Sequence, residues 1–202
     1  MSQKHFVRRA KLSLQSPKDS PPQSNNDAAN IAKLIMENEN EFHIFNDVKI
    51  NIKRVPRKFL SNLLILSSTK NFFSIVKLLI KFGARVNQHV IRLTENSGND
   101  NLAELLRIVM KTQILNGTIN DIDTVRREFD NYHFDLLCTM FEPQSKRRDD
   151  NIIYLLEMGA EPTEYNGAAL SRIFSTGYEN EEAFHLLVEK LSEKLHKMIV
   201  KN

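Results

Sequence analysis

Apolar residues recur at intervals of three and four positions along most of the chain after Pro56. This interval is the helical period, because side chains three and four positions apart lie on one face of an α-helix. Glycines fall between the apolar clusters rather than inside them. The pattern predicts an all-α fold in which short connections join the helices.

The first helix is predicted to begin near Asp27, whose carboxylate can cap a helix. The apolar face of that helix would be formed by Ala28, Ile31, Leu34 and Ile35. Residues 1–26 are basic, rich in Ser and Pro, and contain little apolar surface to bury. We therefore expect a disordered tail over residues 1–26 and one helical domain over residues 27–202.

The segment from Glu41 to Lys53 has a different pattern. Apolar residues fall at alternating positions in this segment, at Phe42, Ile44, Val48, Ile50 and Ile52. Alternation predicts an extended strand or an irregular connection. Pro56 then holds the residue before it in an extended conformation and predicts that a helix begins directly afterwards.

Two segments of the chain repeat one another, Ile75–Ala84 and Asn151–Ala160. Each reads as a short amphipathic helix that ends in Gly-Ala, where the glycine supplies the left-handed conformation of a helix C-terminus. Upstream of the first Gly-Ala, Leu64 and Asn71 are seven positions apart, and Asn71 and Gly83 are twelve apart.

With these spacings, the run from Asn62 to Asn87 resembles an ankyrin repeat. That repeat consists of a helix, a tight turn and a second helix, and it recurs about every 33 residues. The spacing of seven positions recurs from Ile91 to Gly98 and from Leu170 to Gly177, which indicates two further units. A less regular unit covers residues 134–158. The resemblance implies a short ankyrin-like solenoid of stacked helix pairs. It places four glycines at turn or cap positions: Gly83, Gly98, Gly159 and Gly177.

The sequence also departs from the family pattern. Asn62-Leu63-Leu64-Ile65 stands where the family has Thr-Pro-Leu-His, and two linkers between units are short, which predicts stunted hairpins. Residues 111–131 do not fit the spacing. An additional helix that contains Ile122 and Phe129, capped by Asp121, is expected there.

No catalytic, metal-binding or cofactor-binding motif is found among the 202 residues. The single cysteine, Cys138, lies in an apolar helical stretch that offers neither an oriented base nor a depressed pKa, so we expect a buried structural thiol. The six histidines lack the paired spacing of metal ligands. No apolar run approaches the roughly 20 residues of a transmembrane helix. These features predict a non-enzymatic, cytoplasmic protein without a cofactor. An enzyme whose site is assembled from scattered residues is the least favoured alternative.

Positive charge is concentrated in one part of the sequence. Residues 48–94 contain ten bases and no acid, whereas acids outnumber bases after residue 94. Such an asymmetry attracts acidic partners, which can be a protein, a nucleic acid or an anionic membrane. For nucleic acid or anionic lipid, the expected contacts are Lys49, Lys53, Arg54, Arg57 and Lys58.

The ankyrin resemblance implies protein recognition by polar residues at the linkers and at the ends of the first helices. The residues that match those positions are Lys70, Arg85, Gln88, His89, Arg92, Tyr165 and Arg172. The leading hypothesis is thus a protein–protein interaction module with an acidic partner. Divergent repeats of this kind resemble the ankyrin-type effectors of intracellular bacteria and large DNA viruses, which implies a location in the host cytosol. A glutamate-rich C-terminal stretch resembles a secretion signal, and an ordinary amphipathic helix is the alternative.

Overall fold

The computed structural model describes residues 23–115, 122–176 and 181–200. These residues form helices and short connections, with no strand among them, which confirms the all-α prediction. In chain order the elements are α1 (Gln23–Glu37), α2 (Glu41–Asn51), the 3₁₀ turn η1 (Ile52–Arg54), α3 (Arg57–Thr69), α4 (Phe73–Lys81), α5 (Gln88–Asn96), α6 (Asp100–Leu115), α7 (Ile122–Phe129), α8 (Tyr132–Phe141), α9 (Lys146–Glu157), α10 (Glu164–Thr176) and α11 (Glu181–Val200).

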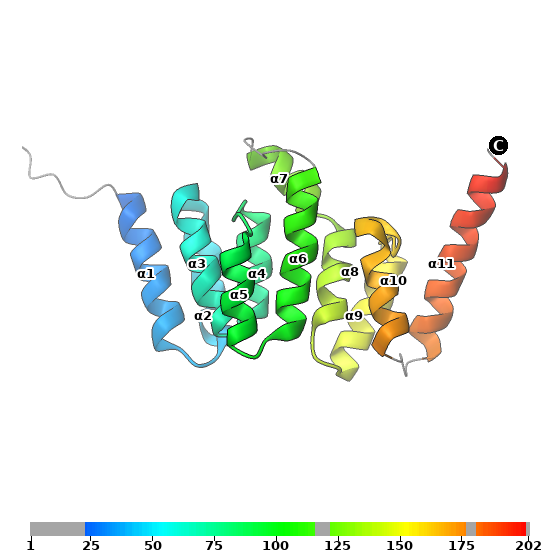
Figure 1. The fold of residues 1–202 in the computed structure, drawn as a ribbon, viewed down its shortest axis with the longest axis horizontal. Helices are drawn as coiled ribbons and strands as arrows, with labels where there is room; N and C mark the ends of the chain where they lie inside the picture. The colour runs from blue at the N-terminus through cyan, green and yellow to red at the C-terminus, as the bar shows by residue number, and fades with distance from the viewer. Residues whose placement is uncertain (1–22, 116–121, 177–180, 201–202) are drawn as a thin grey trace, which may run out of the picture.

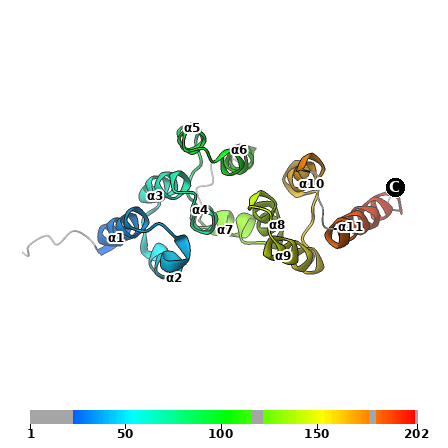
Figure 2. The ribbon, with the colours of Figure 1, turned by 90° about the horizontal axis from the view of Figure 1, so that it is seen from below.

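The helices stand side by side in an elongated row, with α1 at one end and α11 at the other (Figure 1). Consecutive helices pack as pairs in α1–α2, α3–α4, α5–α6 and α8–α9. Seen from below, α5, α6 and α10 lie on one side of a line formed by α4, α7, α8, α9 and α11 (Figure 2). At the C-terminal end, α10 packs on α8 and α11 packs on α9.

The pairing changes in the part of the chain that does not fit the repeat spacing. Helix α6 packs on α5 and α8, and the short helix α7 packs against both α4 and α8. The helix expected around Ile122 and Phe129 is therefore confirmed, whereas its expected cap, Asp121, lies outside the described residues. Phe129 and Val125 of α7 are fully buried, so this helix belongs to the core.

Two helix ends explain the Gly-Ala repeats. After α4, the Gly83 N–H donates to Ile80 O and the Ala84 N–H donates to Leu79 O. The same pair of bonds follows α9, from Gly159 to Leu156 and from Ala160 to Leu155. These bonds satisfy the last carbonyls of each helix, and they need a left-handed residue, which is why glycine stands at φ +89° and +92°. Asn71 and Gly98 end α3 and α5 in the same way, while Gly177 lies outside the described residues.

Two sequence predictions near the N-terminus are wrong. Helix α1 begins at Gln23, so Asp27 lies inside the helix instead of capping it. The segment expected to be extended or irregular forms α2 and η1. Ile44, Val48 and Ile52 are four positions apart and are all buried on one helical face. Phe42 and Ile50, which completed the alternating pattern, are 63% and 64% exposed.

The start of α10 contains one turn of the opposite hand. Tyr165, Asn166 and Gly167 have φ values of +54°, +58° and +69°, so right-handed helix begins only at Ala168. Buried contacts of Tyr165 hold the turn: its ring stacks on Phe129, and its hydroxyl donates to Glu128 O at 3.1 Å.

Candidate functional site

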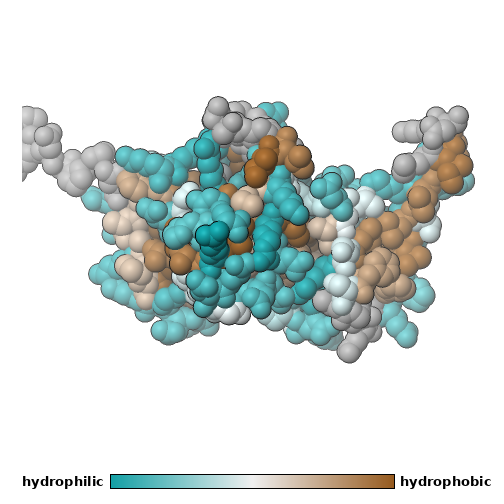
Figure 3. Space-filling model, in the orientation of Figure 1, coloured by the Kyte–Doolittle hydropathy of each residue, from teal (hydrophilic) through white to brown (hydrophobic). Residues whose placement is uncertain are grey.

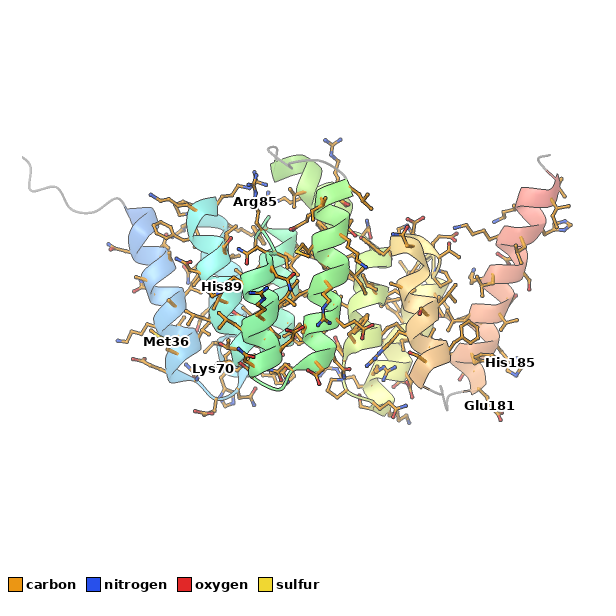
Figure 4. The ribbon with its side chains drawn as sticks, viewed as in Figure 1. Met36, Lys70, Arg85, His89, Glu181 and His185 are labelled. Carbon is orange, nitrogen blue, oxygen red and sulfur yellow. The ribbon has the colours of Figure 1, made fainter. Side chains whose placement is uncertain are left out.

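A cleft of about 460 Å³ lies where the first turn of α3, the segment after α4, the end of α6 and helix α7 meet. We call it the α3–α6 cleft. It is lined by Arg57, Gly83, Arg85, Val86, Asn87, Gln88, Met110, Gln113, Ile114 and Val125. Among the residues that the structure describes, this lining contains two guanidinium groups and no carboxylate. Arg85 lies at the upper edge of the row of helices, on the side where α6 ends (Figure 4).

The α4–α5 linker is held against α6 by one side chain, that of Gln113. Its Nε2 donates to Ala84 O at 3.0 Å, and its Oε1 accepts from the Val86 N–H at 3.0 Å. Both polar groups of the amide are thereby used to fix the residues on either side of Arg85. The position of the Arg85 backbone is therefore set by the tertiary structure and not by the linker alone.

Arg57 and Gly83 are in close contact on one wall of the cleft. A Cβ atom placed on Gly83 would lie 3.1 Å from Nε and Nη2 of Arg57, so the guanidinium packs over the glycine backbone. Gly83 follows the last turn of α4, where the negative end of the helix dipole favours a cation. Glycine at this position thus ends the helix and also provides the space in which Arg57 lies.

The apolar part of the cleft is formed by side chains from three elements. Val86 and Val125 are buried, and Met110 is partly buried. Ile114 lies in the last turn of α6 and is 67% exposed. Brown, hydrophobic side chains gather near this end of α6 in the space-filling view (Figure 3).

The cleft continues onto an exposed polar surface of α5, which we call the α5 face. It is formed by Gln88, His89 and Arg92, all exposed. Asn87 caps the helix by accepting from the Val90 N–H at 3.0 Å. Glu95, the single acid of α5, is paired with Arg107 of α6. Hydrophilic side chains accordingly cover α5 in Figure 3, and His89 lies along the same side as Arg85 in Figure 4.

The residues predicted to contact an anionic partner lie around the α2–α3 connection. Lys49 is in the last turn of α2, Lys53 and Arg54 are in η1, and Lys58 is in the first turn of α3. These four side chains are exposed. Arg57 differs, because it is partly buried and lines the cleft together with Arg85. The cleft therefore brings Arg57, which was proposed to contact an anionic partner, together with Arg85 and Gln88, which were proposed to contact a protein.

Lys70, also predicted to bind a partner, makes contacts within the protein. Its Nζ donates to Met36 O at 2.8 Å and to Asn38 O at 2.9 Å. One carbonyl belongs to the last turn of α1 and the other to the residue directly after the helix, where backbone acceptors lack partners within the helix. Lys70 thus ties α3 to the C-terminus of α1, at the opposite end of the helices from Arg85 (Figure 4).

Tyr165 and Arg172 are likewise engaged inside the array. The Tyr165 ring packs on Phe129 and Phe134, and burial raises the pKa of its hydroxyl. Arg172 of α10 pairs with Glu104 of α6 at 3.6 Å, and it also bonds Asn101 and lies over the Phe141 ring. The structure does not bring these two residues to the cleft, so we do not include them in the candidate site.

Cys138 is fully buried in α8, as the sequence predicted. Burial raises the pKa of its thiol to about 12, in the opposite direction from the depressed pKa of a nucleophilic cysteine. Nearby, Asp135 accepts from Lys77 and Lys81 of α4, at 3.2 and 3.0 Å. Burial by itself would lower the pKa of Lys77, but electrostatic interactions with Cys138 and Asp135 outweigh burial and raise that pKa.

Within the described ranges, no three His, Cys, Asp or Glu side chains are grouped so that they could hold a metal ion. None of the helices described is long and apolar enough to cross a membrane. Comparison of the chain with models of protein families, with curated proteins and with solved structures finds no match. The site must therefore be interpreted from its own geometry.

Sequence reasoning identified Arg85, Gln88, His89 and Arg92 but missed Gln113. A glutamine in an amphipathic helix has no local signal for such a role, because its two hydrogen bonds go to residues 27 and 29 positions away. Gly83 was recognised as a helix terminus, but its contact with Arg57 depends on how α3 packs against α4.

Proposed function

We propose that this protein is a non-enzymatic protein–protein interaction module that binds a partner with an acidic surface. The observation that carries the proposal is the continuity of the α5 face with the α3–α6 cleft. Arg85, Gln88, His89 and Arg92 are exposed there, and the cleft residues that the structure describes include no carboxylate. Complementary charge of this kind steers association and selects against basic partners.

The scaffold that we propose for this role is a divergent ankyrin-like array. Support comes from the spacing of seven and twelve positions and from the matching helix termini at Asn71, Gly83, Gly98 and Gly159. Arrays of stacked helix pairs present extended surfaces for binding. Helix α7, which packs between α4 and α8, is the main departure from a regular array.

Direct binding of nucleic acid or anionic lipid is the second candidate function. It is favoured by the exposure of Lys49, Lys53, Arg54 and Lys58 around one connection. Contacts of this type are salt-dependent, because the released counterions supply most of the free energy. They are also nearly indifferent to base sequence.

The narrower proposal of a secreted effector rests on the divergent repeats and, in addition, on the glutamates of α11. The first turn of this helix contains Glu181 and Glu182, and its last turn contains Lys197. The helix dipole favours this distribution, and α11 packs on α9, so the glutamates have a structural explanation. We therefore base the proposed function on the cleft and the α5 face alone.

The proposal is tested by capturing partners from cell lysate on the tagged full chain and quantifying them by mass spectrometry. The variant Arg85→Glu/Arg92→Glu reverses charge on the proposed surface. Lys146→Glu/Lys197→Glu makes the same charge change on α9 and α11 and serves as the control. We expect to find proteins that bind the native chain and the control variant but do not bind the surface variant. Identical capture by all three proteins would contradict the proposal.

The two candidate functions are separated by measuring binding to DNA, RNA and liposomes that contain an anionic phospholipid, at low and at near-physiological salt. If the protein binds a protein partner, any binding to DNA, RNA or liposomes at low salt should be lost as the salt concentration rises. Tight binding that persists at near-physiological salt and falls in Lys53→Glu/Lys58→Glu would instead favour the second function.

A further inference from the structure

We propose that the α3–α6 cleft binds a partner segment in which a large apolar side chain stands next to an aspartate or glutamate. The apolar side chain enters between Val86, Ile114 and Val125, and the carboxylate pairs with Arg85. This inference rests on the proposed function and specifies the chemistry that the partner must present.

The first step of the argument is that Arg85 is held on a fixed backbone. Gln113 bonds the carbonyl of Ala84 and the N–H of Val86, so the residues before and after Arg85 cannot move independently of α6. A binding group on a fixed backbone loses less conformational freedom when its ligand arrives. This arrangement is typical of a binding site rather than of a solvated linker.

The second step concerns the charge of the cleft. Arg85 and Arg57 come from different elements and line the same cleft, and the guanidinium of Arg57 packs over Gly83 at the C-terminal end of α4. A guanidinium group matches the planar geometry of a carboxylate, to which it can donate two parallel hydrogen bonds. The cleft therefore suits a carboxylate near Arg85.

The third step is the apolar wall beside these charges. Ile114 is 67% exposed at the rim, while Val86 and Val125 form buried surface next to it. A volume of about 460 Å³ lies within the range of ligand pockets and is large enough for an apolar side chain. A ligand that carries charge alone would leave the apolar side chain of Ile114 exposed to water.

The chemistry of the wall favours a peptide over a nucleic acid. None of the described residues that line the cleft is aromatic, so they offer no surface on which a base could stack. A phosphate backbone could pair with the arginines but would place no apolar group against Ile114. An acidic segment with an adjacent apolar residue satisfies both parts of the cleft.

The test is selection of a displayed library of random dodecapeptides on the full chain, followed by fluorescence anisotropy with the enriched peptides. We expect these peptides to carry an acid within two positions of a large apolar residue. Replacing that acid by its amide, or the apolar residue by alanine, should weaken binding at least tenfold. Selection that yields no such pair overturns the inference.

Variants of the protein locate the binding. Ile114→Glu and Arg85→Glu should each weaken peptide binding at least tenfold. Ile50→Glu introduces the same change at a comparably exposed isoleucine of α2 and should have no effect. Because Ile114 and Ile50 are both exposed, neither substitution should impair folding, which circular dichroism can verify.

The outcomes distinguish this inference from the proposed function. Peptides that bind and respond to Arg92→Glu but not to Ile114→Glu or Arg85→Glu would overturn the cleft assignment and leave the α5 face as the binding surface. Displacement of a bound peptide by oligothymidine at near-physiological salt would overturn the assignment to a peptide and favour nucleic acid. If the native chain binds neither a displayed peptide nor a protein from lysate, both proposals are contradicted.

Discussion

Gly83 and Gly159 end their helices with the same backbone geometry but have different surroundings. Both have φ close to +90° and both donate to the preceding helix in the same pattern. A Cβ atom on Gly159 would meet no atom within 4 Å, whereas a Cβ atom on Gly83 would meet the guanidinium of Arg57. The two positions therefore separate the cost of the left-handed backbone from the effect on a neighbouring side chain.

Gly83→Ala and Gly159→Ala should each lower the free energy of unfolding by about 1–2 kcal/mol, the cost of a left-handed conformation for a residue with a Cβ atom. Gly83→Ala should in addition displace Arg57, so its effect should be non-additive with Arg57→Ala. Urea denaturation of the single and double variants measures this coupling. The control is the pair Gly159→Ala and Arg57→Ala, whose effects on the free energy of unfolding should be additive. Equal coupling in both pairs would show that Arg57 does not pack over Gly83.

At the scale of elements, the start of α10 combines an ordinary helical sequence with a left-handed turn. Tyr165 is fixed in the turn by its ring and hydroxyl contacts, while Asn166 beside it is exposed. A β-carbon disfavours the left-handed conformation, although asparagine tolerates it better than most residues. The buried contacts of Tyr165 thus compensate for an unfavourable local backbone.

Asn166→Gly should raise the free energy of unfolding by about 0.5–1 kcal/mol, because glycine adopts positive φ without a steric penalty. Asn151→Gly is the matched control, since Asn151 is exposed within right-handed α9, where glycine weakens a helix by up to about 1 kcal/mol. Thermal denaturation should give midpoints that move in opposite directions. A fall in both midpoints would mean that residue 166 is right-handed.

At the scale of the whole molecule, polar side chains connect successive helix pairs at the helix ends. Glu41 of α2 accepts from the Ser74 N–H at 2.9 Å and from the Ile75 N–H at 3.3 Å, so it caps the N-terminus of α4 from a different pair. Lys70 caps α1 from α3 in the same manner. These contacts fix how the first two pairs are stacked.

Glu41 should make stability depend on pH. Burial raises its pKa above the usual 4.5, although the bonds from Ile75 and Ser74 act to lower it. Between the unfolded and the raised folded pKa, the folded state binds more protons than the unfolded state, so the contribution of Glu41 to stability falls as pH rises through this window.

Glu41→Gln removes this titration and should leave a flatter pH profile. The difference in the free energy of unfolding, native protein minus variant, should decrease as the pH rises above about 4.5 and should then become constant. Chemical denaturation at a series of pH values measures it, with the exposed Glu39→Gln as control. A difference that increases with pH over this window would contradict the raised pKa of Glu41.

Local features of the sequence were sufficient to predict the helices and several of their ends. The three-and-four periodicity predicted the all-α class, and Gly83 and Gly159 marked the ends of α4 and α9. The alternating residues 41–53 misled the prediction, because Ile44 and Val48 fit a helical face as well as a strand. Side-chain periodicity over so short a segment does not distinguish the two structures until burial is known.

Apart from residues 41–53, the sequence by itself determined which segments are helical, because helix formation and termination depend on residues within a few positions of each other. The tertiary structure decided which polar residues remain available for a partner. Lys70, Tyr165 and Arg172 are used inside the array, whereas Arg85 stays at the cleft on a linker held by Gln113. Their bonding partners lie about 30 to 70 positions away in the chain, and only packing of the helices brings such groups within hydrogen-bonding distance.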